Sequence, residues 1–93
     1  MDAQEQIRRL VEEIHRSHPR AATELNCFDS GAAMLDVRIA GKVLVMAYSP
    51  KSGFGVDQLA EDEGFDTGYR FISHDFENAA AELRRLIEGA GGG

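Results

Sequence analysis

The sequence predicts a small α+β domain in which two helices, one from each end of the chain, lie on the same face of an antiparallel sheet. Apolar residues repeat at helical spacing in the first and last segments, and alternate with polar residues in the middle. The turns between the middle segments are too short for parallel connections. We therefore expect a two-layer sandwich, α-β-β-β-β-α in order, with three or four strands.

The first helix is expected over residues 2–17. Asp2 can cap it by accepting a hydrogen bond from the free backbone amide of residue 5, and Pro19 ends it. The residues of its apolar stripe are spaced i, i+3, i+4 and i+7, which places them on one side of the helix. They are Ile7, Leu10, Val11 and Ile14.

Strands are expected over residues 22–29, 34–40 and 42–48. Ser30-Gly31 is a turn signal, and Ala40-Gly41 fits a tight two-residue hairpin because glycine readily adopts positive φ. The second of these strands alternates cleanly, with apolar residues on one face and charged residues on the other. The apolar residues are Leu35, Val37 and Ile39, and the charged residues are Asp36 and Arg38.

Residues 50–68 are expected to form a mobile, acidic, glycine-rich loop with a short extended piece at residues 54–56, followed by a strand over residues 69–73. A final helix is then expected, with Ser73 or Asp75 as its cap. Glycine is a common helix stop, which gives a domain over residues 1–88 and a flexible tail over residues 89–93. The apolar stripe of this helix consists of Phe76, Ala79, Ala80, Leu83, Leu86 and Ile87.

Composition narrows the range of functions. The chain has 93 residues and a net charge of −6, and an acidic domain without a basic face is a poor ligand for nucleic acid or anionic membranes. Cys27 is the single cysteine, so no disulfide can form within the chain. The first residues lack a secretory pattern, and no apolar run is long enough to span a bilayer. We expect a cytoplasmic protein.

Several residue groups resemble reactive or metal sites without meeting their requirements. His15, His18 and His74 could bind zinc, but zinc needs three or four converging ligands and the chain has no second cysteine. Residues 73–75 carry the side chains of a hydrolase triad, but neighbours in sequence point in different directions, so helix capping is the expected role. Cys27 is expected to be a partly buried strand residue. No catalytic residue and no metal ligand is predicted.

The loop residues give two further weak resemblances. Residues 51–55 match only a fragment of a phosphate-binding loop, because the lysine precedes the glycines. The acids between Asp57 and Asp66 do not alternate as a calcium loop requires. We expect a solvated loop and no cofactor.

The strand over residues 42–48 is apolar on both faces. One interpretation is that Val43, Val45 and Ala47 face the helices, which leaves the alternate residues facing away. That outer face would then be either an exposed apolar patch or a surface covered by the loop. The outward residues in this interpretation are Leu44, Met46 and Tyr48.

The leading hypothesis is a small non-enzymatic module that contacts a partner protein or a second copy through the outer sheet face and the 50–68 loop. The acidic loop would attract a basic partner. An alternative is a small-molecule-binding or sensor domain, with a pocket between the glycine-rich loop and the sheet. An enzyme would need an acid–base pair or a nucleophile, and no spacing indicates one. The predicted partner-binding residues are Leu44, Met46, Tyr48, Phe54 and Phe65.

Overall fold

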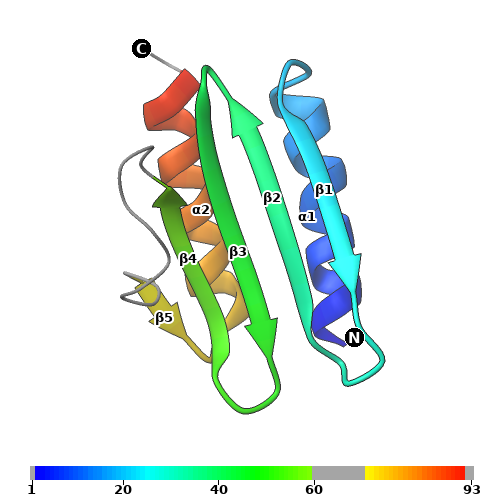
Figure 1. Cartoon of the computed structure of the whole chain (residues 1–93). Coiled ribbons are helices and arrows are strands. Elements are labelled where there is room, and N and C mark those ends of the chain that lie inside the picture. Colours follow the sequence, from blue (N-terminus) through cyan, green and yellow to red (C-terminus); the bar gives the residue numbers. More distant parts are fainter. Residues whose placement is uncertain (1, 60–70, 92–93) are drawn as a thin grey trace.

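Two helices cover one face of an antiparallel sheet, so the α+β sandwich is confirmed (Figure 1). The computed structural model describes residues 2–59 and 71–91. Five strands lie in these residues, whereas the sequence predicted three or four. The elements are α1 (Ala3–Ser17), β1 (Ala22–Cys27), β2 (Ala33–Ile39), β3 (Lys42–Ser49), β4 (Gly53–Leu59), β5 (Phe71–Ser73) and α2 (Phe76–Gly91).

Helix α1 begins and ends where capping chemistry favours it. The Asp2 side chain accepts a hydrogen bond from the backbone amide of Glu5 at 2.8 Å. At the other end, the His18 amide donates to the Ile14 carbonyl at 2.7 Å, one residue before Pro19. The helix buries one side against the sheet. Its buried residues are Ile7, Leu10 and Ile14.

The sheet is a meander in which every strand pairs antiparallel with its neighbours in sequence, in the order β1-β2-β3-β4-β5. Ala40 and Gly41 join β2 to β3 with positive φ values of 52° and 76°, as a tight two-residue hairpin requires. This turn fixes the register, with Ile39 opposite Lys42.

That register sets the two faces of β3. Leu44 lies opposite Val37, and Met46 lies opposite Leu35, so both point toward the helices. Leu44 and Met46 are each 0% exposed and belong to the core cluster. The predicted orientation of β3 is therefore wrong. The outer face carries Val43, Val45 and Ala47.

Strand β4 lies within the expected loop, so the loop prediction is wrong for residues 53–59, of which only residues 54–56 were expected to be extended. Phe54 and Val56 point toward the helices and are buried in the core. Gly53, at φ +78°, starts the strand where its backbone passes close to Ser73. Alternating burial outweighed the low strand propensity of glycine here. Residues 60–68 lie outside the described residues.

Helix α2 begins at the predicted cap. The Asp75 side chain accepts from the Glu77 amide at 3.0 Å, and the Ser73 hydroxyl accepts from the Asp75 amide at 3.1 Å. The helix then continues through Gly89 to Gly91, beyond the expected stop. It packs on β3, β4 and β5. Its fully buried residues are Ala79, Ala80, Leu83 and Ile87.

Candidate functional site

The predicted partner-binding residues lie mostly in the core. Phe54 is only 3% exposed, and it packs against Tyr48 with ring centroids 4.6 Å apart. Tyr48 is half-buried on the helix side. Like Leu44 and Met46, these two rings face the helices and not the outer face. Phe65 lies outside the described residues.

An apolar row crosses the outer face at one level of the sheet. Met34 on β2 is opposite Ala47 on β3, and both are half-buried. Ile72 on β5 completes the row opposite Gly55, and it is 61% exposed. A large apolar side chain that is so exposed is a candidate contact residue. We call this set the apolar row, and it consists of Met34, Ala47, Gly55 and Ile72.

A row of carboxylates runs beside the apolar row. Glu24 on β1 lies directly opposite Asp36 on β2, and like charges in such a pair destabilise a sheet. Asp57 occupies the same level on β4, where its side chain accepts from the Gln58 amide at 2.8 Å. Val45 lies between Asp36 and Asp57 but is only 1% exposed, so it is enclosed within the monomer. We call Glu24, Asp36 and Asp57 the acidic row.

A shallow depression of about 290 Å³ adjoins the acidic row over β1 and β2. Glu24 and Asp36 line it together with Arg38, which is exposed two residues further along β2. The outer face therefore has a shallow depression beside the acidic row. It is predominantly acidic along this row and apolar along the neighbouring one.

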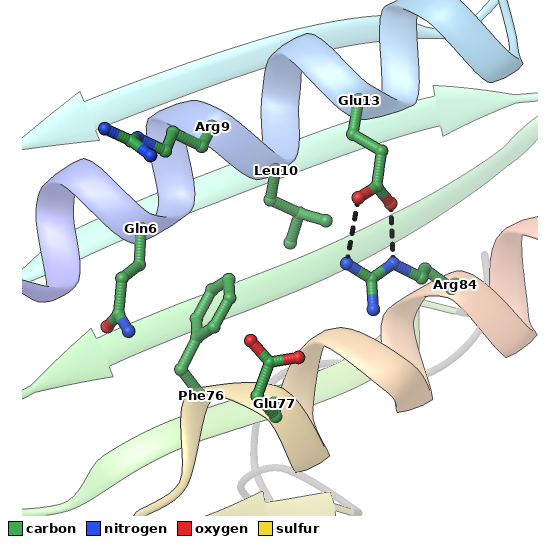
Figure 2. A pocket seen from close by; sticks show the side chains of 7 residues that line it. All are labelled: Gln6, Arg9, Leu10, Glu13, Phe76, Glu77 and Arg84. Carbon is green, nitrogen blue, oxygen red and sulfur yellow. Dashed lines mark hydrogen bonds and ion pairs between the residues drawn. The ribbon is translucent and has the colours of Figure 1, made fainter.

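A second hollow, of about 390 Å³, lies between the two helices on the opposite side of the molecule. Figure 2 shows Leu10 and Phe76 pointing into it, and the guanidinium of Arg9 pointing away from it. Glu13 and Arg84 face each other across the hollow and bind one another. Of the two arginines that line this hollow, Arg9 is thus directed outward and Arg84 is paired with Glu13.

The Glu13–Arg84 pair is bidentate, with N–O distances of 2.6 and 3.0 Å, and its hydrogen bonds raise the pKa of Arg84. Both side chains are substantially exposed, at 39% for Arg84 and 44% for Glu13, so solvent weakens the interaction. It links α1 to α2. Because the bridge joins two separate elements, it is one of the contacts between the helices.

A double-mutant cycle of Glu13→Gln and Arg84→Met should give a coupling of about 0.5–1 kcal/mol in the free energy of unfolding. Urea titrations measure it, and about 1 M salt should remove most of it because the Debye length falls to roughly 3 Å. Glu82→Gln and Arg85→Met serve as the control, since that bidentate pair lies within α2. A coupling for Glu13 and Arg84 that is unchanged by salt would contradict this interpretation.

The candidate reactive residues His15 and Cys27 each contact a different residue. His15 Nε2 lies 2.8 Å from the Thr23 hydroxyl, and the exposed thiol of Cys27 lies 3.8 Å from the Arg8 guanidinium. Within residues 2–59 and 71–91, no group of three or more histidine, cysteine or acidic side chains is arranged to hold a metal ion. Asp75, one of the two caps that the sequence offered, caps α2, and the Ser73 hydroxyl accepts from the Asp75 amide just before the helix.

The predicted small-molecule pocket depended on a glycine-rich loop beside the sheet. Gly53 and Gly55 instead lie inside β4, where both are buried. Residues 53–59 of that loop are therefore part of the sheet.

Comparisons with protein-family models, with curated protein sequences and with solved structures found no match. In the described part of the chain, neither helix is long and apolar enough to cross a membrane.

Sequence reasoning missed Ala47 as an outer-face residue because it assigned the faces of β3 the wrong way round, and it did not single out Met34, Asp36 or Ile72 as contact residues. The signal was present in the hairpin. A two-residue turn at Ala40-Gly41 places each odd-numbered residue of β2, including Leu35, Val37 and Ile39, opposite an even-numbered residue of β3.

Proposed function

We propose that this domain is a non-enzymatic interaction module that binds a basic, amphipathic segment of a partner protein on its outer sheet face. The observation that supports the proposal is the apolar row beside the acidic row, on the face opposite both described helices. A segment with apolar residues along one side and lysine or arginine along the other matches this pattern.

Exposure and charge have separate roles in the proposed complex. Ile72 is the best anchor, because burial of a large aliphatic side chain contributes about 1.5–3 kcal/mol and 61% of this residue is still exposed. Glu24 and Asp36 would mainly accelerate encounter and fix orientation. Binding would also relieve the repulsion between these two carboxylates, since a bound cation lies between like charges.

Pairing of the partner's cations with the acidic row predicts discrimination by charge. A lysine-rich amphipathic peptide should shift the amide resonances of Met34, Ala47 and Ile72 in an isotope-labelled sample. A glutamate-rich peptide of the same apolar content should not. The Ile72→Asp change should weaken binding of the lysine-rich peptide about tenfold, which corresponds to about 1.4 kcal/mol.

The matched control is Ala81→Asp, which introduces the same charge at an exposed position of α2, away from the proposed surface. This variant should bind as the unmodified chain does. Equal binding of both peptides, or resonance shifts confined to the hollow between the helices, would contradict the proposal.

A further inference from the structure

Strand β1 forms one edge of the sheet along its full length of six residues (Figure 1). The other edge strand, β5, has only three residues. An exposed edge is a template for another strand, and proteins usually blunt it with proline, a bulge or charges. The stretch Ala22–Cys27 contains no proline and one charged residue, Glu24.

The hairpin register identifies which backbone groups of β1 point outward. The Ile39–Lys42 pair closes the two-residue turn, so odd-numbered residues of β2 bond toward β3 and even-numbered ones toward β1. The Phe28 amide donates to the Ala32 carbonyl at 2.9 Å, which agrees with this alternation. The partners of the even-numbered β2 residues are Ala22, Glu24 and Asn26.

The backbone groups of Thr23, Leu25 and Cys27 therefore point away from β2 into the open edge. Within the described residues, no side chain or loop backbone bonds to these groups. Thr23 and Cys27 contact α1 only through their side chains, at His15 and Arg8.

We propose that this edge pairs with β1 of a second copy of the chain, antiparallel about a two-fold axis through Leu25. In this register Leu25 faces Leu25 of the second copy, and Thr23 faces Cys27 of the second copy. The backbone amides and carbonyls of all three residues point outward. The outward amides of each copy therefore lie opposite the outward carbonyls of the other copy. The two sheets would join into one continuous sheet with both sets of helices on the same side.

Charge selects this register over its nearest rival. About Leu25, Glu24 of one copy lies beside Asn26 of the other, and an amide can donate to a carboxylate. A shift of the axis to Glu24 would bring two glutamates together at about 4.5 Å between Cα atoms, which is unfavourable. The proposed pairing is separate from binding at the outer face, because it uses the edge backbone and needs no other protein.

Cross-linking tests the pairing directly. The Thr23→Cys variant would place its new thiol opposite Cys27 of the second copy, at about 5.5 Å between Cα atoms, which is within disulfide range. With oxidised glutathione, we expect a covalent dimer. The side chain of Ala22→Cys points to the other face of the sheet, so this variant should form little covalent dimer. Thr23→Cys combined with Cys27→Ser should lose the symmetric double cross-link. Equal yields from Thr23→Cys and Ala22→Cys would overturn the proposal.

Sedimentation tests the register without covalent chemistry. The Asn26→Lys change should strengthen association about fivefold by pairing with Glu24 of the second copy, and Asn26→Asp should weaken it by a similar factor. Ala81→Lys and Ala81→Asp make the same changes in net charge on α2 and should leave association unaltered. A chain that stays monomeric at every concentration, or equal responses at positions 26 and 81, would overturn the proposal.

Discussion

The Met46→Asp variant should lose roughly half or more of the domain's stability at room temperature. Met46 is 0% exposed and faces the helices, so the substitution removes its packing and places an unpaired carboxylate in the core. The expected cost is about 4–6 kcal/mol in the free energy of unfolding. A domain of this size has a total stability of only about 5–10 kcal/mol. Urea titration followed by circular dichroism measures the loss.

Ala47→Asp is the matched control for this substitution. Ala47 is the next residue on β3, is half-buried and faces outward, so the same side chain there should cost about 1 kcal/mol or less. The comparison tests the face assignment itself. If Ala47→Asp unfolded the domain and Met46→Asp did not, the strand would be oriented as the sequence first indicated.

The Gly53→Ala variant should lose about 2–4 kcal/mol of stability. Gly53 has φ +78°, where an L-residue is strained. An added Cβ would also lie 2.8 Å from the Ser73 carbonyl oxygen and 2.9 Å from His74 Nδ1. The Ser73 oxygen is backbone, so relief requires β4 to move away from β5 and the start of α2. Thermal unfolding should therefore show a clear drop in the melting temperature.

Gly41→Ala separates strain from crowding. Gly41 has almost the same φ, +76°, but an added Cβ would meet no atom within 4 Å. The loss of stability in Gly41→Ala should come from backbone strain at positive φ alone, about 1–2 kcal/mol. Similar losses at Gly41 and Gly53 would mean that the close approach of β4 to Ser73 does not limit packing.

The helices were predictable because capping and periodicity agree in both. Asp2 caps α1 and Asp75 caps α2, and each apolar stripe coincides with the side that is buried. The end of α2 was not predictable from Gly89 alone. A glycine weakens a helix by only about 1 kcal/mol, so contacts further along can extend it. Ala90, which packs against the core, supplies such a contact.

The faces of β3 could not be read from its own residues, because both sides are apolar and either orientation satisfies alternation. The turn at Ala40-Gly41 decides between them, since β2 has a single apolar face and the register transfers it to β3. Strand β4 was missed for a different reason. Gly53 and Gly55 lower strand propensity, and the two large side chains that drive its burial, Phe54 and Val56, are too few to outweigh them in a local reading.

The meander of adjacent strands has a consequence for how the chain assembles. In the described region, pairing β1 with β2, β2 with β3 and β3 with β4 requires only short loops to close, so little chain entropy is lost before contacts form. Formation of the sheet can therefore begin at the tight turn between β2 and β3 and continue outward one strand at a time. This topology predicts that the two helices, at opposite ends of the chain, pack onto the sheet after these strands have paired.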